Sequence, residues 1–380
     1  MISSENYQIK KLIQRAILVL MALCLAACDG SKTGAGQTTA GDAEFSYAGK
    51  TITVVIGLDA SAGGTTLGRL FAKHLEQNLP GNPTVIVNNM PGASTLNAHL
   101  HVLLKAPKDG TTVYYGPRSS LGELLKLPGF TFKYSDFTPL GGVQVAGLVV
   151  YARNDALPSG VDSAEDVVGK APLNFGGMTS GHGRMIISTM ALDLIGANYN
   201  YIAGYAGSGS IRAAVISGEV GAATDAAHAY LNQVAPVLVD TGKALPLFSM
   251  PVMNENGDLG QNTLVPDVPS VPVLYETLKG EAPSGIAWDA FVTMLELDQT
   301  MSHVFLGPPG MNSQASEIFR EGLEKALTSA AYFEEAQKVL SYAPEHVAYE
   351  RQAEIQGATE NVSDEVLSFI RAHIKKLDGN

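Results

Sequence analysis

Cysteine is almost absent from this chain of 380 residues, because its only two, Cys24 and Cys28, both lie near the N-terminus. The rest of the chain can form no disulfide and offers neither a thiolate metal ligand nor a cysteine nucleophile. Positive charge is also scarce, with 25 Lys and Arg against 37 Asp and Glu and a formal net charge of −12. Nucleic acids and anionic lipid surfaces are bound through basic patches, so this balance argues against both as partners.

Catalytic and nucleotide-binding signatures are missing as well. The sequence has no Gly-x-Ser-x-Gly nucleophile elbow, P-loop, complete Gly-x-Gly-x-x-Gly or His-Glu-x-x-His. His182 has no second His or carboxylate at metal-site spacing, so we expect it to form hydrogen bonds within a loop. We therefore predict a protein that is not an enzyme and has no metal or cofactor. A hydrolase on an α/β scaffold is the alternative, since a Ser–His–Asp triad can assemble from distant residues.

The N-terminal segment has no apolar run long enough to span a bilayer. Basic residues precede a short apolar run at 16–23, which is typical of a signal peptide. The run ends in the tetrapeptide 25–28 (LAAC), which resembles a bacterial lipobox. This resemblance implies cleavage before Cys28 and lipid attachment to it, and Asp29 resembles the retention signal of inner-membrane lipoproteins. An ordinary signal peptide with a chance cysteine is the alternative. The residues up to 46 indicate a flexible tether.

Three times in the chain, an apolar run leads into a loop rich in Gly, Ser and Thr that opens onto a helical pattern. The loops cover residues 57–66, 176–183 and 204–210. A helix N-terminus carries unpaired N–H groups and the positive end of the helix dipole, and glycine lets a ligand approach the backbone closely. We therefore predict a site for a small anion that is assembled from backbone and hydroxyl groups. Each loop alone could equally be a tight turn without a ligand.

Strand-like runs alternate with helical patterns from residue 51 to 115 and again from residue 173. This order predicts an α/β fold with mostly parallel sheets covered by helices. Two apolar runs, 146–151 and 244–250, bracket the second α/β unit. We interpret them as strands that link two lobes.

An ordered series of short motifs between about residues 50 and 340 resembles one family. The motifs are Gly63-Gly64-Thr65-Thr66 with Arg69, residues 85–93 (VIVNNMPGA), Lys108-Asp109-Gly110, Phe175-Gly176 with Gly181, residues 204–208 (GYAGS), residues 217–220 (SGEV) with Asp225, residues 266–270 (PDVPS) and residues 306–310 (LGPPG). In this order they resemble the extracytoplasmic solute receptors of tripartite tricarboxylate transporters, the Bug (TctC-like) family.

The resemblance implies a type II periplasmic binding protein fold, with two α/β lobes joined by two hinge strands and a ligand cleft between them. The expected parts are a lipoprotein signal peptide at 1–27, a flexible tether at 28–46, lobe 1 at 47–148 and 247–380, and lobe 2 at 149–246. The implied function is a receptor lipid-anchored to the periplasmic face of the inner membrane. It would bind a small carboxylate and deliver it to a two-component integral membrane permease. We expect a monomer; a sensory lipoprotein of the same fold is the alternative.

The predicted ligand-binding residues lie in the three loops and after the third strand of lobe 1. They are Asp59, Ala60, Gly63, Gly64, Thr65, Arg118, Ser119, Gly177, Thr179, Ser180, His182, Gly183, Tyr205, Gly207, Ser208 and Asp225. Arg118 could pair with a distal carboxylate or be a solvated surface residue. Tyr205 could close over the ligand or pack within lobe 2. Asp225 is expected to tie a loop rather than to touch the ligand.

Three positions leave the ligand class open. Leu67 stands where the family commonly has an Asp, and Gly221 stands at a second such position. Arg184 begins a helical pattern, where a cation is unfavourable for the helix dipole, so a ligand or an acidic partner beside it is one interpretation, and an arginine with neither is the alternative.

Overall fold

The structure, a computed structural model, describes residues 45–379 apart from 61, 128, 146, 254–257 and 300. The expected signal peptide, Cys28 and most of the tether lie outside the described residues. Residues 45–380 form one unit by their contacts. Within the described part of the chain, no helix combines the length and apolar character needed to cross a membrane.

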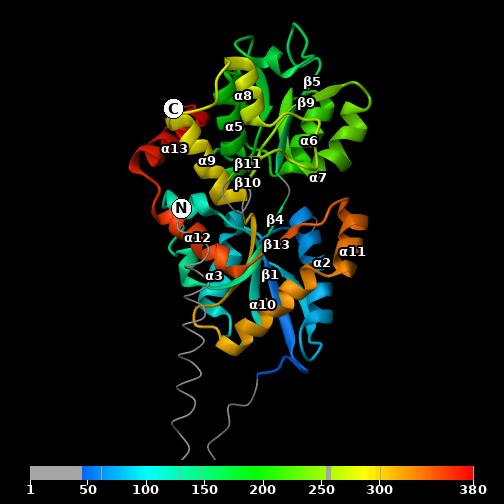
Figure 1. Ribbon diagram of the computed structural model, residues 1–380, viewed down its shortest axis with the longest axis vertical. Helices are drawn as coiled ribbons and strands as arrows, with labels where there is room; N and C mark the ends of the chain where they lie inside the picture. Colours follow the sequence, from blue (N-terminus) through cyan, green and yellow to red (C-terminus); the bar gives the residue numbers. More distant parts are fainter. Residues whose placement is uncertain are drawn as a thin grey trace, which may run out of the picture. The chain divides into compact units, whose positions relative to one another are not determined.

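A six-stranded sheet combines strands from the first part of the chain with strands from its last third (Figure 1). In spatial order the strands are β13 (Glu345–Val347), β4 (Thr138–Gln144), β12 (His303–Gly307), β3 (Thr112–Pro117), β1 (Thr51–Ile56) and β2 (Thr84–Asn89). β1 is parallel to β2 and β3, as the alternation of strands and helices predicts. β12 is antiparallel to β3 and β4, because the chain returns to this sheet from the other one.

A five-stranded sheet repeats the same plan. Its order is β7 (Tyr199–Ile202), β6 (Leu173–Gly176), β8 (Ala222–Ala226), β5 (Leu148–Arg153) and β9 (Ala244–Ser249). β6 is parallel to β7 and β8, whereas β5 is antiparallel to β8 and β9. β5 and β9 correspond to the two apolar runs that the sequence assigns to the link between lobes, and they pair side by side. Two sheets built this way confirm the predicted two-lobed type II architecture.

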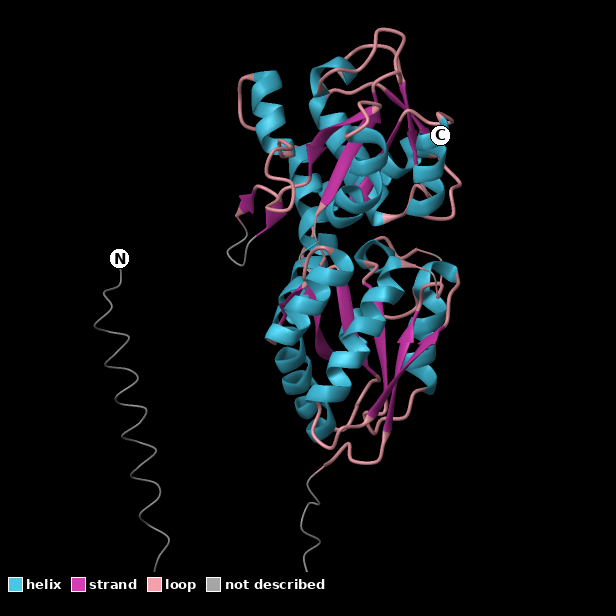
Figure 2. Cartoon of the chain, turned by 90° about the vertical axis from the view of Figure 1, so that its right-hand side faces the viewer, coloured by secondary structure: helices cyan, strands magenta, loops and turns pink. Residues whose placement is uncertain are grey.

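Helices lie on both faces of the sheets (Figure 2). Those whose contacts are mainly with the six-stranded sheet and its connections are α2 (Gly63–Asn78), η2 (Ala93–Thr95), α3 (Leu96–Lys105), α4 (Ser120–Leu124), η3 (Tyr134–Asp136), α10 (Ser313–Leu327), α11 (Ala330–Leu340) and α12 (Tyr349–Glu360). Those around the five-stranded sheet are η4 (Ala164–Val167), α5 (Gly183–Ile195), α6 (Ser208–Ser217), α7 (Ala227–Ala229), the π-helical η5 (Tyr230–Val239), α8 (Val271–Lys279), α9 (Ile286–Gln299) and α13 (Asp364–Leu377). β10 (Val252–Met253) and β11 (Leu259–Gly260) form a small separate hairpin.

The core follows the alternation of side chains along β1. Val54 and Ile56 are buried in the cluster that contains Phe71 of α2, whereas Val55 is buried in the cluster on the other face. Leu67 of α2 also belongs to the first cluster and is 2% exposed. The side chain at this position therefore fills the core.

The C-terminal third of the chain divides between the two sheets. The sequence analysis places all of 247–380 in lobe 1, whereas α8 and α9 pack on α5 and α13 packs on both α5 and α9 (Figure 1). An amphipathic pattern shows that a helix packs, but it does not show against which sheet. This difference matters for the site, since α9 and α13 bring acidic side chains to the second predicted loop.

Candidate functional site

The first predicted loop joins β1 to α2 and is fixed by its own side chains. The buried Thr65 donates its Oγ1 hydrogen to the carbonyl of Asp59, at 2.7 Å. Asn89 Nδ2 donates to the carbonyl of Leu58 at 2.7 Å and to Thr65 Oγ1 at 3.0 Å. Asp59 and Ala60 are exposed, and a Cβ added at Gly63 would meet no atom within 4 Å. The loop is thus held in place while its glycine edge stays open.

The second loop, before α5, already faces carboxyl groups of this chain. Ser180 Oγ donates to the carboxylate of Asp378, and Gly183 lies directly against Asp298 Oδ2 of α9, where a Cβ would collide with that oxygen. Thr179 stays exposed. Gly177 lies against Tyr201, leaving no room for a side chain. The carboxyl of Asp298 thus stands at the N-terminus of α5, the position predicted for a ligand anion.

The third loop, before α6, is tied to the second one. Gly207 is the N-cap of α6, and Ser208 Oγ accepts a hydrogen bond from Arg184 Nη1 at 2.7 Å. The Tyr205 hydroxyl donates to Glu219 Oε1 at 2.6 Å, and this bond raises the pKa of Tyr205 to about 12. Tyr205 is therefore hydrogen-bonded to an acidic side chain of the same lobe.

Arg118 is 4% exposed, so the alternative of a solvated surface arginine is wrong. Its guanidinium lies over the ring of Tyr134 at 4.8 Å and donates to Gln356 Oε1 at 3.2 Å. Burial lowers the pKa of Arg118, and Tyr134, Glu123 and Asp298 oppose this effect. Burial in turn raises the pKa of Asp298 to about 7, against the influence of Arg118.

The remaining predicted residues near these elements have structural partners. The Ser119 backbone N–H donates to the Tyr134 hydroxyl at 2.7 Å. Asp225 is 1% exposed and accepts from Arg212 Nη1 at 2.6 Å and from the Tyr151 hydroxyl at 3.1 Å. Burial raises the pKa of Asp225, while Arg212, Arg184 and the Tyr151 bond oppose the rise.

Four residues that the sequence analysis did not select form a buried polar group. They are Tyr115, His228, His303 and Tyr342, here called the His–Tyr cluster. Each carries a fully buried polar atom without a hydrogen-bond partner among the described residues, namely the two tyrosine hydroxyls and the Nδ1 of both histidines. Such an atom costs about 1–3 kcal/mol when it stays unpaired. Several of them in one place indicate a site that a polar ligand or water completes.

The His–Tyr cluster draws on both sheets. The rings of Tyr115 in β3 and His303 in β12 stack with centroids 5.6 Å apart. The rings of Tyr342, before β13, and His228 in α7 stack at 4.7 Å. His303 also reaches the first loop, because a Cβ at Gly64 would lie 3.3 Å from His303 Nε2.

The positive charge at this cluster comes from arginine. Burial, with a smaller contribution from Arg184, lowers the pKa of His228 to about 4 and that of His303 to about 3. The pKa of His182, an exposed side chain, is also lowered, with Arg184 among the causes. The histidines are therefore neutral near pH 7, and Arg212 is paired with Asp225. Arg184 is hydrogen-bonded to the neutral hydroxyl of Ser208 and forms no ion pair among the described residues.

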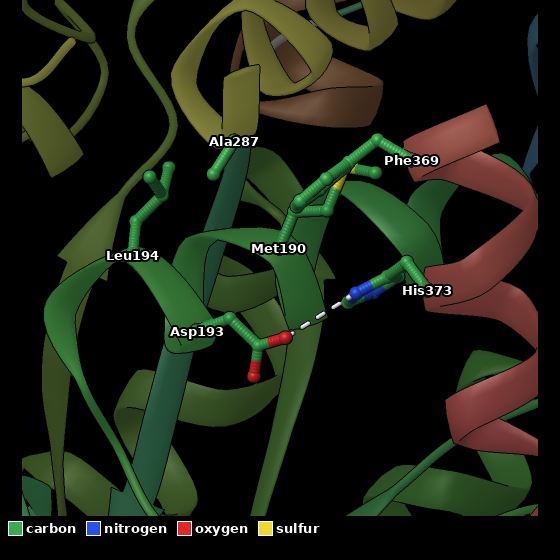
Figure 3. Close-up of a pocket in the computed structure, with 6 residues that line it drawn as sticks. All are labelled: Met190, Asp193, Leu194, Ala287, Phe369 and His373. Carbon is green, nitrogen blue, oxygen red and sulfur yellow. Dashed lines mark ion pairs between the residues drawn. The ribbon is translucent and has the colours of Figure 1, made fainter. Parts of the chain in front are cut away.

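A small hollow elsewhere is less suited to an anion (Figure 3). It has a volume of about 70 Å³ and is lined by Met190, Asp193, Leu194, Ala287, Phe369 and His373. Asp193 Oδ2 lies 3.3 Å from His373 Nδ1, and Asp193 also pairs with Lys376. These contacts hold α13 on α5, and the Asp193 carboxylate would repel an anion. Among the described residues, no group of three or more His, Cys, Asp or Glu could hold a metal ion.

Comparison with known proteins gives a consistent result at the level of the fold. No protein-family model matches the sequence, and no curated protein matches it. Solved structures do match it. A TctC solute-binding protein from Polaromonas, without ligand, has a TM-score of 0.58 at 17% identity, covering 87% of this chain and 100% of that one. The periplasmic binding protein BugD has a TM-score of 0.60 at 19% identity, covering 86% and 99%.

A ligand-bound structure has the same fold. MatC from Rhodopseudomonas palustris, with bound malate, has a TM-score of 0.58 at 16% identity, covering 83% of this chain and 99% of that one. The chain thus has the two-lobed fold of the TctC and Bug periplasmic binding proteins. The resemblance seen in the sequence is confirmed for the architecture.

Proposed function

We propose that this chain is a periplasmic solute receptor of the Bug (TctC-like) kind and binds a small carboxylate between its two lobes. The observation that carries this proposal is the His–Tyr cluster beside Arg184, whose buried polar atoms come from both sheets and have no hydrogen-bond partner within the described part of the chain. Solute-binding proteins of the same fold support it, since one holds malate and another from R. palustris holds adipate.

The chemistry of the cluster suits a carboxylate. Arg184 offers a charge-assisted hydrogen bond, and the hydroxyls of Tyr115 and Tyr342 offer further donors. Because these groups belong to two sheets, a ligand that bonds to all of them favours the conformation in which the lobes meet. The open edge of the first loop at Gly63 remains a candidate for backbone contacts, as do Gly207 and Ser208 of the third loop.

Binding is tested with the full chain purified in detergent and titrated calorimetrically with mono-, di- and tricarboxylates. We expect at least one ligand to bind with a Kd well below 1 mM, and we expect Arg184→Gln to weaken it at least tenfold, about 1.4 kcal/mol. The matched control is Arg371→Gln, an exposed arginine of α13, which should bind as the wild type does. Failure of all the carboxylates to bind would exclude the proposal.

We further propose lipid attachment at Cys28 and delivery of the ligand to a two-component integral membrane permease. Cells that express the chain should incorporate labelled palmitate into it, and Cys28→Ala should abolish the label, whereas Cys24→Ala should not. Neighbouring genes for one large and one small membrane protein would favour transport. A neighbouring sensor kinase alone would favour the sensory alternative.

A further inference from the structure

The groups that the sequence predicts as anion holders are largely matched by the chain's own acidic residues. Ser180 donates to Asp378, Tyr205 donates to Glu219, and Gly183 at the start of α5 lies against Asp298. A carboxylate at a helix N-terminus gains from the helix dipole in the same way as a ligand anion would. Three of the predicted contacts for a ligand anion are thus already taken by carboxyl groups of the chain.

Arg118 has acidic neighbours as well. Glu123 and Asp298 both act on its guanidinium electrostatically, and Gln356 links it to Glu123 through hydrogen bonds of 3.2 Å and 2.8 Å. Glu123 alone balances the positive charge of Arg118, and any ionised fraction of Asp298 makes the surroundings negative. A second carboxylate of a ligand would therefore meet no surplus positive charge here.

The His–Tyr cluster, by contrast, lies beside Arg184, which forms no ion pair among the described residues. Arg184 donates to the neutral Ser208, while the neighbouring Arg212 is bound to the buried Asp225 at 2.6 Å. Asp225 also acts on Arg184 electrostatically, so the two guanidinium groups and this one carboxylate together leave one positive charge beside the neutral rings of the cluster. The local charge therefore suits one carboxylate attached to an uncharged remainder.

We propose that the ligand of this receptor is a monocarboxylate whose remainder carries no charge, and that Glu123 and Asp298 disfavour dicarboxylates by neutralising Arg118. This inference rests on the proposed function, because it specifies the ligand of that same site. It distinguishes the chain from proteins of the same fold that bind malate or adipate.

The test compares ligands matched in length on the full chain purified in detergent. Calorimetry is run with hexanoate against adipate, with 2-hydroxybutyrate against malate and with benzoate against terephthalate. We expect the monocarboxylate of at least one pair to bind, and to bind at least tenfold more tightly than its dicarboxylate. Tighter binding of the dicarboxylates would overturn the inference and leave the proposed function intact. Absence of binding by all six would overturn the inference, and failure of the tricarboxylates as well would overturn the proposed function.

Two variants test the role of the acidic neighbours. Glu123→Gln removes a negative charge beside Arg118, and Asp298→Asn removes the partly ionised carboxyl group there, so each should strengthen dicarboxylate binding at least threefold and leave monocarboxylate binding unchanged. Glu317→Gln, an exposed site on α10, is the matched control. If neither variant changes the preference while both unfold at the wild-type temperature, Arg118 does not exclude the second carboxylate and this part of the inference is wrong.

Discussion

The ring of Tyr342 stacks on the ring of His228, with centroids 4.7 Å apart and planes inclined by 23°. Tyr342 precedes a strand of the six-stranded sheet, whereas His228 follows a strand of the five-stranded sheet. The stacked rings bury each other's apolar faces. The Tyr342 hydroxyl and His228 Nδ1, however, are buried without a hydrogen-bond partner among the described residues. The contact is therefore well packed and incomplete in hydrogen bonding, which is what a ligand-binding position requires.

Tyr342→Phe should separate binding from stability. The substitution keeps the stacked ring and removes a hydroxyl that has no described partner, so the unfolding temperature should stay the same or rise. If the hydroxyl donates to the ligand, carboxylate affinity should fall about fivefold to tenfold, or about 1 kcal/mol. Thermal unfolding and calorimetry measure the two effects on the same preparation.

The control for this variant is Tyr332→Phe. The Tyr332 hydroxyl is buried and donates to the carbonyl of Pro344 at 2.8 Å. Its removal should lower the unfolding temperature and leave ligand affinity unchanged, the reverse of the Tyr342 result. Loss of stability without loss of affinity in Tyr342→Phe would remove Tyr342 from the site.

Gly183→Ala should destabilise the protein through Asp298. A Cβ at Gly183 would collide with Asp298 Oδ2, although alanine is otherwise favoured over glycine in a helix by about 1 kcal/mol. In the Asp298→Ala background the collision is absent, so the same substitution should become neutral or stabilising. The free energy of unfolding in urea for both single variants and the double variant gives the coupling.

Gly357→Ala is the matched control for that cycle. Gly357 lies inside α12, and a Cβ there would meet no atom within 4 Å. Alanine should therefore raise the free energy of unfolding by about 0.5–1 kcal/mol, whatever residue occupies position 298. A coupling energy near zero between positions 183 and 298 would show that Asp298 does not stand at the start of α5.

The local signals in the sequence predicted the framework of the fold. The apolar runs and glycine-rich loops correspond to β1 followed by α2, β6 followed by α5, and β7 followed by α6. These predictions succeed because the period of apolar residues and the chemistry of turns act between near neighbours. α12 was not expected, since its buried residues are mostly polar, with Gln352 and Gln356 among them.

The partners of the loops could not be predicted in the same way. Asp298 and Asp378 contact the second loop although they lie more than a hundred positions further along the chain. The sequence around Ser180 and Gly183 contains no feature that predicts these contacts. The His–Tyr cluster was missed for the same reason. No other residue of the cluster lies near His303 or Tyr342 in the sequence. The two come close to the rest of the cluster only because β12 and β13 pair with β4 in the six-stranded sheet.

His99 should make stability depend on pH in the weakly acidic range. The ring is fully buried, and its Nδ1–H donates a hydrogen bond to the carbonyl of Thr95 at 3.1 Å. It lies against the ring of Tyr114, with centroids 3.9 Å apart. Burial lowers its pKa from 6.5 to about 4, and the Thr95 bond only partly opposes this. Because the unfolded chain binds the proton more readily, the contribution of His99 to stability is complete above pH 6.5 and is lost as the pH falls towards 4.

The loss should amount to about 3 kcal/mol over that interval. Urea unfolding of the full chain at a series of pH values measures the slope for the wild type and for His99→Phe, which keeps an aromatic ring in the core. The variant should show a shallower decline between pH 6.5 and 4, to which His228, His303 and His346 also contribute because burial lowers their pKa values too. An unchanged slope in His99→Phe would mean that His99 is not held neutral by burial, because a ring that titrates equally in both states adds nothing to the dependence of stability on pH.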